Sequence, residues 1–134
     1  MRVQKSRFLA IICLGFAAFA TAAGVHAQQT RHIALKSGES TELRNYYFVQ
    51  HCRSIMIGNP VLDVLEGPKE VAVSLKGGMK VPQKCTKPVL GGTVVATAKD
   101  VKAPKEAKLT IRLKFNTKVG ERQSSNVYIV SLFP

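Results

Sequence analysis

The stretch LTIRLKFN at residues 109–116 decides the fold, because every second residue in it is apolar. A period of two is typical of a β-strand that turns one face to a core and the other to water. A second apolar run at 127–132 follows a polar stretch that contains Gly120. We therefore expect an antiparallel pair of strands joined by a long, polar hairpin.

Shorter strand-like runs recur before this pair and are bounded by turn-forming residues. They span 32–35, 41–43, 46–49, 54–57, 61–65, 71–75 and 93–97. We expect Gly58-Asn59-Pro60, Gly77-Gly78 and Gly91-Gly92 to end strands, and residues 98–108 to form an exposed loop. No segment shows a helical apolar stripe of useful length. The pattern predicts an all-β, immunoglobulin-like antiparallel sandwich of about seven or eight strands.

The N-terminus has the pattern of a secretory leader. Arg2, Lys5 and Arg7 precede an apolar run at 8–23, which ends with Val25-His26-Ala27. This pattern predicts a cleaved signal peptide over residues 1–27 and a single domain over residues 28–134. A retained membrane anchor is the alternative. A bilayer-spanning helix needs about 20 apolar residues, and the run at 8–23 is shorter than that. We expect a periplasmic or secreted protein with no transmembrane segment after cleavage.

Three cysteines are present, and only Cys52 and Cys85 follow the expected leader. Cys13 lies inside the apolar run rather than at its end, so we do not expect it to carry lipid. A lone pair in an exported chain normally forms a disulfide, because the compartment is oxidising. A metal-binding or nucleophilic cysteine is the alternative, but no Cys-x-x-Cys spacing with further ligands accompanies the pair. We therefore predict a Cys52–Cys85 bridge.

The chain is strongly basic, with 20 Lys and Arg against 8 Asp and Glu. No acidic residue lies between Glu70 and Asp100, and the basic residues of 102–118 face only Glu106 in that stretch. Such a field favours anionic partners: an acidic polysaccharide, a lipid surface or an acidic protein. We expect no nucleic-acid binding, because no recognition motif is present. The candidate ligand-binding residues are Lys76, Lys80, Lys84 and Lys87, and a merely solvated loop is the alternative.

No catalytic or metal-binding pattern stands out. A copper site could use His32, His51, Met56 and Met79, but a His-x-Met pair is missing. His51 and Cys52 are expected to point to opposite faces of a strand, so they do not form a nucleophile and its base. We predict no enzyme activity, no cofactor and no metal.

The remaining polar and aromatic candidates also favour structural roles. Asp63 and Glu66 are close in sequence but nothing marks them as a catalytic pair, and Ser124 and Ser125 lack a Gly-x-Ser-x-Gly setting. Aromatic residues are scarce, so most of them are expected in the core. The alternative is an aromatic patch that contacts a ligand, formed by Tyr46, Tyr47, Phe48 and Tyr128.

The segments HIALKSGESTEL and SIMIGNPVLDVLEG resemble the N-terminal domain of bacterial pilus-assembly and secretin-type envelope proteins. The matching residues are Ile33, Leu35, Gly38, Ser40, Ile55, Gly58, Asn59, Pro60, Asp63 and Val64. The chain departs from that domain at Cys52 and Cys85 and throughout its C-terminal half. This resemblance implies a β-sandwich and an envelope location more than a role in secretion.

Two broader resemblances point the same way. The whole expected domain, with SLFP at its end, is similar to small exported alpha-proteobacterial proteins of uncharacterised role. That similarity implies a periplasmic or secreted protein and supplies no functional residues. The stretch LTIRLKFNTKVGERQSSNVYIVSL resembles the last hairpin of immunoglobulin-like domains. The cysteine spacing is short for the inter-sheet bridge of those domains, and their buried Trp is missing.

Three functional hypotheses follow. The first is an exported, non-enzymatic module that binds an anionic envelope component or a protein partner. The second is an accessory structural subunit of a pilus or secretion assembly, which requires a sheet edge open to strand addition. The third is an enzyme or a metal carrier, which requires a pocket with His32 or His51 beside acidic residues.

Overall fold

A computed structural model describes residues 29–134. The expected leader at 1–27 and Cys13 lie outside the described residues. Within 29–134 all the regular structure is β, and no helix long and apolar enough to cross a bilayer is found. The strands are β1 (Arg31–Lys36), β2 (Ser40–Tyr46), β3 (Val49–Gln50), β4 (Arg53–Ser54), β5 (Met56–Glu66), β6 (Val71–Lys80), β7 (Val89–Ala98), β8 (Lys105–Thr117) and β9 (Gly120–Phe133).

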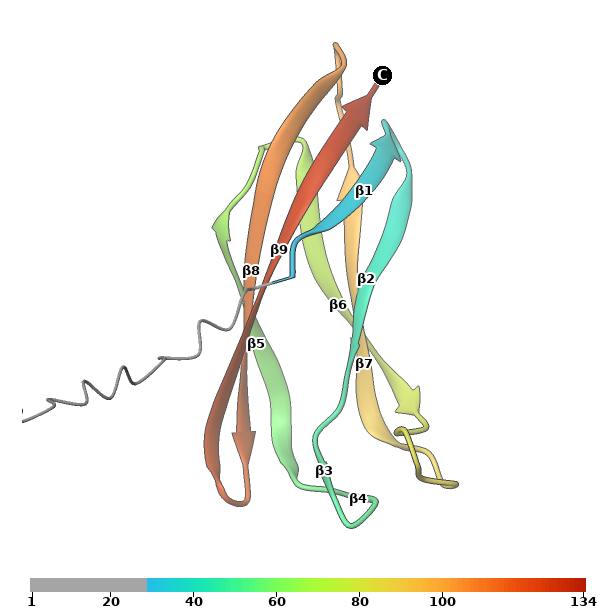
Figure 1. The fold of residues 1–134 in the computed structure, drawn as a ribbon, viewed down its shortest axis with the longest axis vertical. Coiled ribbons are helices and arrows are strands. Elements are labelled where there is room, and N and C mark those ends of the chain that lie inside the picture. The colour runs from blue at the N-terminus through green and yellow to red at the C-terminus, as the bar shows by residue number, and fades with distance from the viewer. Residues whose placement is uncertain (1–28) are drawn as a thin grey trace, which may run out of the picture.

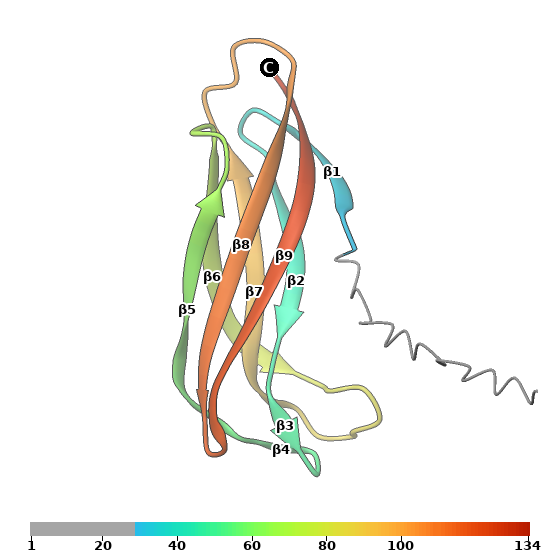
Figure 2. The same cartoon turned by 60° about the vertical axis from the view of Figure 1, so that its left-hand side comes forward.

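The long strands form two sheets that face each other (Figures 1 and 2). One sheet has the order β1-β9-β8-β5, the other has the order β2-β7-β6, and β3 and β4 make a separate short hairpin. Strand β1 runs parallel to β9, whereas the other paired strands are antiparallel. The predicted immunoglobulin-like sandwich is confirmed, with the short β3–β4 hairpin in addition to the seven longer strands.

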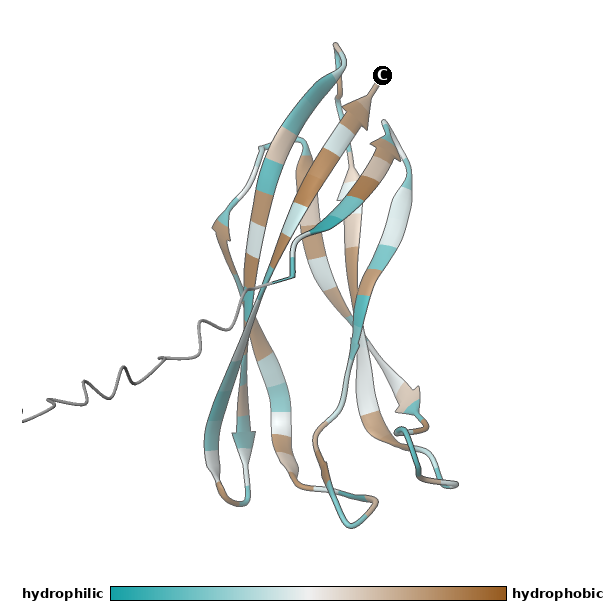
Figure 3. Ribbon diagram, viewed as in Figure 1, coloured by the Kyte–Doolittle hydropathy of each residue, from teal (hydrophilic) through white to brown (hydrophobic). Residues whose placement is uncertain are grey.

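The core lies between the sheets and follows the alternation of the sequence. In β8 the apolar residues of LTIRLKFN are buried and the polar ones face outward, as the bands along the strand in Figure 3 show. Phe115 packs against Tyr46 and Phe48, with ring centroids 6.2 and 5.7 Å apart. The buried cluster consists of Leu35, Leu43, Tyr46, Val71, Val94, Ala96, Ala98, Val101, Leu109, Ile111, Leu113, Phe115, Tyr128, Val130 and Leu132.

The two glycine pairs do not form turns, so that prediction is wrong. Gly77 lies opposite Gly92, and Gly78 opposite Gly91, inside the β6–β7 ladder. A methyl group on Gly92 would overlap the phenol of Tyr46 and the backbone carbonyl oxygen of Lys76. Glycine is therefore required at this position because an aromatic ring packs against the bare backbone. The β6–β7 ladder continues past the glycine pairs to Lys80 and Val89.

Gly58-Asn59-Pro60 does not end a strand either. It lies within β5, where pairing with β8 is interrupted between Ile57 and Val61 and Gly58 has a φ of 68°. Proline is tolerated there because β5 is an edge strand, on which a missing N–H need not break the ladder. The segment is a bulge that bends the edge rather than a turn.

The C-terminal hairpin is tighter than expected. Thr117 pairs with Gly120, so β8 and β9 are joined by Lys118 and Val119 alone. The expected loop at 98–108 is shorter than predicted as well, because β8 begins at Lys105. Long strands with short connections place three turns at one end of the sandwich and the remaining loops at the other.

Polar residues of β9 connect the two sheets. The guanidinium Nη1 of Arg44 on β2 donates to Ser124 Oγ at 2.7 Å and to Asn126 Oδ1 at 2.6 Å. Burial lowers the pKa of Arg44. Ser124 thus lies within β9 and joins this strand to β2.

Candidate functional site

Three turns meet at the lower end of the molecule in Figures 1 and 2. They are the β3–β4 turn (His51 and Cys52), the β6–β7 loop (residues 81–88) and the β8–β9 turn (Lys118 and Val119). We call these three turns the disulfide end. Each belongs to a different part of the chain, so their meeting is a property of the fold.

The disulfide joins the first two turns, and hydrogen bonds link the β6–β7 loop and the β8–β9 turn to residues that flank the β3–β4 hairpin. The predicted Cys52–Cys85 disulfide is confirmed, with the two Cα atoms 5.6 Å apart, and it joins two turns rather than the two sheets. The backbone N–H of Lys118 donates to the carbonyl of Ile55 at 2.9 Å. The N–H of Gln83 donates to the Tyr47 hydroxyl at 3.4 Å. The disulfide end is therefore one connected unit.

The backbone of this end is unusual. Among residues 29–134, four non-glycine residues have positive φ, and three of them lie here: His51 at 51°, Cys52 at 59° and Lys84 at 65°. Positive φ at both central residues is typical of a type I′ two-residue hairpin turn. His51 and Cys52 are thus turn residues, and the expectation that they alternate along a strand is wrong. Left-handed conformations of this kind cluster at functional sites.

A hollow of about 260 Å³ lies over the disulfide. It is lined by His51, Cys52, Arg53, Lys84, Cys85, Thr86 and Lys87. Three of these residues carry cationic side chains, and none of them is acidic. The nearest carboxylate in sequence to the β8–β9 turn belongs to Glu121, which accepts a hydrogen bond from Gln123 at 3.1 Å. The hollow is therefore a small basic concavity.

The structure brings together half of the predicted ligand-binding lysines. Lys84 and Lys87 line the hollow. Lys80 is the last residue of β6, opposite Val89, and Lys76 lies further along β6, opposite Thr93, so neither reaches the hollow.

Sequence reasoning did not include Arg53 or His51 among the ligand-binding residues. Both flank Cys52, and the disulfide places them beside the neighbours of Cys85. The predicted bridge itself was the signal that could have identified them.

The cations on β8, unlike those of the hollow, lie beside carboxylates. Lys105 Nζ lies 2.8 Å from Glu70 Oε2, and Lys108 Nζ lies 3.8 Å from Glu66 Oε2. Arg112 and Lys114 each lie 3.7 Å from Asp63 Oδ2. Glu106 is the sole acidic residue of the sequence stretch 102–118, but strand pairing places the carboxylates of β5 beside the basic residues of β8.

Asp63 and Glu66 thus form ion pairs between β5 and β8. By contrast, no ion pair forms within residues 29–134 at the predicted lysines or at Arg53. The cations that line the hollow therefore form no ion pair with any of residues 29–134.

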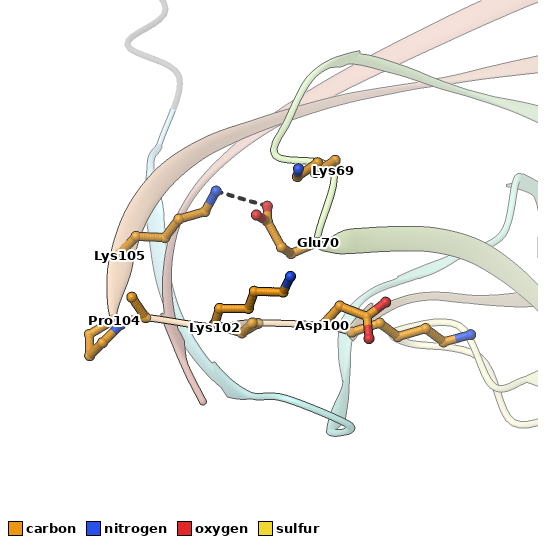
Figure 4. A pocket seen from close by; sticks show the side chains of 9 residues that line it. Lys69, Glu70, Asp100, Lys102, Pro104 and Lys105 are labelled. Carbon is orange, nitrogen blue, oxygen red and sulfur yellow. Dashed lines mark ion pairs between the residues drawn. The ribbon is translucent and has the colours of Figure 1, made fainter.

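A larger groove of about 730 Å³ lies at the opposite end, between the β5–β6 turn (residues 67–70) and the β7–β8 loop (residues 99–104). We call this region the loop end. It is lined by Lys69, Glu70, Lys99, Asp100, Val101, Lys102, Ala103, Pro104 and Lys105. Figure 4 shows the Lys105–Glu70 ion pair across this groove.

The groove at the loop end mixes both signs of charge. A hydrogen bond from Lys105 lowers the pKa of Glu70, which stays anionic at neutral pH. Asp100 supplies a second carboxylate to the lining. The larger groove therefore combines cations with carboxylates, whereas the smaller hollow over the disulfide has no carboxylate in its lining.

Within residues 29–134, no group of three or more His, Cys, Asp or Glu side chains could hold a metal ion. No protein-family model matches the chain, and no curated protein sequence shows a significant match to it.

Proposed function

We propose that this protein is an exported, non-enzymatic binding module whose disulfide end binds an anionic component of the cell envelope. One observation carries the proposal. The cations of β8 lie beside carboxylates, whereas Arg53, Lys84 and Lys87 share a basic hollow with no carboxylate in its lining.

Charge and rigidity support this role together. Uncompensated cations on one end of a protein attract anionic surfaces and speed association. The disulfide fixes the turns that carry these cations, so little ordering is left to occur on binding. A preorganised basic end favours a binding module over a loop that is merely solvated.

Export is supported by the leader pattern and by the disulfide. Disulfides persist mainly in oxidising compartments. The intact mass of protein purified from its native cell tests this part of the proposal. A chain that starts near Gln28 with Cys52 bonded to Cys85 supports export. A retained Met1 or two free thiols would contradict it.

The binding proposal is tested with dextran sulfate as a soluble anionic probe. We compare Lys84→Glu/Lys87→Glu with Lys99→Glu/Lys102→Glu, which has the same net charge but is altered at the loop end. A lysine near an anionic surface contributes about 1 kcal/mol, so the first pair should weaken binding by more than about tenfold. The second pair should change affinity by much less.

Salt dependence provides an independent check. The Debye length falls from about 30 Å at 0.01 M salt to about 3 Å at 1 M, so wild-type affinity should fall steeply over this range. Equal losses for both pairs of substitutions would show that net charge alone, and not the disulfide end, determines binding. Affinity that does not respond to salt would remove the electrostatic basis of the proposal.

A second candidate function is an accessory structural subunit of a pilus or secretion assembly. Strand β5 pairs only with β8, and Val61 and Val64 on it are 57% and 49% exposed. An unpaired edge with apolar side chains is what strand addition uses. Val61→Lys/Val64→Lys should abolish co-purification with secretin or pilus components from envelope extracts, since lysine on an edge strand blocks pairing. Extracts in which the wild-type protein retains no such component would count against this function.

A further inference from the structure

The disulfide end carries exposed apolar side chains as well as cations. Val81 in the β6–β7 loop is 59% exposed, and Val119 in the β8–β9 turn is 53% exposed. Each follows a lysine directly, Lys80 in one case and Lys118 in the other. Two turns from distant parts of the chain thus present the same pair of features, a cation beside an exposed valine.

The β6–β7 hairpin adds to this apolar surface. Met79 and Leu90 lie opposite each other in the ladder and are 59% and 55% exposed. Both lie next to the loop that carries Lys84 and Lys87. Apolar side chains are therefore found on the outermost part of this hairpin, where polar side chains would cost nothing in packing.

A soluble anionic polymer would use only the cations of this end. The exposed valines would gain nothing from a hydrated polysaccharide, whereas they would leave water on entering the boundary between head groups and acyl chains. A surface that combines cations with exposed apolar side chains is typical of peripheral membrane binding.

The loop end also carries lysines and exposed apolar side chains, but carboxylates lie among its lysines. Leu65 and Phe133 are about half exposed there, at 50% and 46%. However, Leu65 is followed by Glu66, and Glu70 and Asp100 line the nearby groove. An anionic surface would repel these carboxylates, whereas no carboxylate lines the hollow at the disulfide end, so the disulfide end suits such a surface better.

We propose that the disulfide end docks on a lipid bilayer that contains anionic lipids. Arg53, Lys84, Lys87 and Lys118 contact the head groups, and Val81 and Val119 insert between them. This inference rests on the proposed function and names its anionic component as a membrane surface. The covalently joined turns form a broad base, so the long axis of the sandwich stands away from the bilayer (Figure 1).

The test uses vesicles of equal parts phosphatidylcholine and phosphatidylglycerol, vesicles of phosphatidylcholine alone, and dextran sulfate. We compare Val81→Ser/Val119→Ser with Leu65→Ser/Phe133→Ser, which removes two half-exposed apolar side chains from the loop end. The first pair should weaken binding to the anionic vesicles by about tenfold and leave binding to dextran sulfate unchanged. The control pair should leave both affinities unchanged, and neutral vesicles should bind weakly in every case.

Each outcome bears on one of the two proposals. Wild-type binding to dextran sulfate but not to anionic vesicles would overturn the membrane inference and leave the proposed function intact. Vesicle binding that is unaffected by Val81→Ser/Val119→Ser would also overturn it. Absence of binding to either probe would overturn the proposed function itself. Urea midpoints of all variants, together with the conservative pair Val81→Thr/Val119→Thr, separate a loss of contact from a loss of fold.

Discussion

At the disulfide end a covalent bond joins the β3–β4 turn to the β6–β7 loop, whereas at the loop end an ion pair joins the β5–β6 turn to β8. The loop end also uses a backbone hydrogen bond of 2.8 Å from Lys99 to Glu70. Holding loops together with charges neutralises those charges. A disulfide holds loops together without using any charge, and this leaves the cations beside it available to a ligand.

Removal of the disulfide should have the largest effect on this comparison. Cys52→Ser/Cys85→Ser opens a loop of 33 residues, which corresponds to about 3–4 kcal/mol of stability on a chain-entropy estimate. Urea denaturation measures the loss. Amide hydrogen exchange should show lower protection at residues 47–57 and 81–88 and unchanged protection in the β7–β8 loop. Equal loss of protection at both ends would show that the disulfide stabilises the whole sandwich rather than one end.

Sequence reasoning predicted the fold well for a physical reason. The alternation in β8 and β9 is a local signal, and the side chains it assigns to the core, such as Leu109 and Val130, are fully buried. The role of Gly92 could not be predicted in the same way. A glycine pattern does not show whether a turn or the ring of Tyr46 requires the missing side chain.

The candidate site was predicted only in part for a similar reason. An acid-free stretch of sequence identified Lys84 and Lys87. Whether a cation is paired depends on strand register, which placed Arg112 beside Asp63 and could not be derived from local sequence. Arg53 joined the site through the disulfide, so it is distant from Lys84 in sequence and close to it in space.

The next largest effect is expected at the glycine pairs that support the hairpin of the disulfide end. Gly92→Ala places a methyl group against the phenol of Tyr46, and overpacking of this kind costs about 1–3 kcal/mol. Gly78→Ala is the matched control, because no atom lies within 4 Å of the added methyl group. It should leave the urea midpoint unchanged or raise it slightly. Equal destabilisation by the two changes would contradict the packing role of Tyr46.

Smaller effects of opposite sign are expected from neutralising one lysine at each end. Lys105→Gln removes the partner of Glu70 and should lower stability slightly, as is usual for exposed ion pairs. Lys87→Gln removes a charge from a cluster of cations and should leave stability unchanged or raise it slightly. Thermal melts at low salt measure both changes, and high salt should reduce the difference. Destabilisation by Lys87→Gln would indicate that this lysine has an ion pair in solution.

The smallest effect concerns pH and separates the two ends by titration. The hydrogen bond from Lys105 lowers the pKa of Glu70 in the folded state, so the pair stabilises the protein above the unfolded pKa of about 4.3. This stabilisation is lost as pH falls through the folded pKa, where Glu70 becomes protonated. The urea midpoint of the wild-type protein should therefore exceed that of Glu70→Gln at neutral pH, and the gap should close in acid.

Stability contributed by the disulfide should not change over this range, because its sulfur atoms do not titrate. A gap that persisted below the folded pKa would mean that Glu70 stabilises the loop end by its shape rather than by its charge, and the contrast between a covalently held end and an electrostatically held end would then fail at this position.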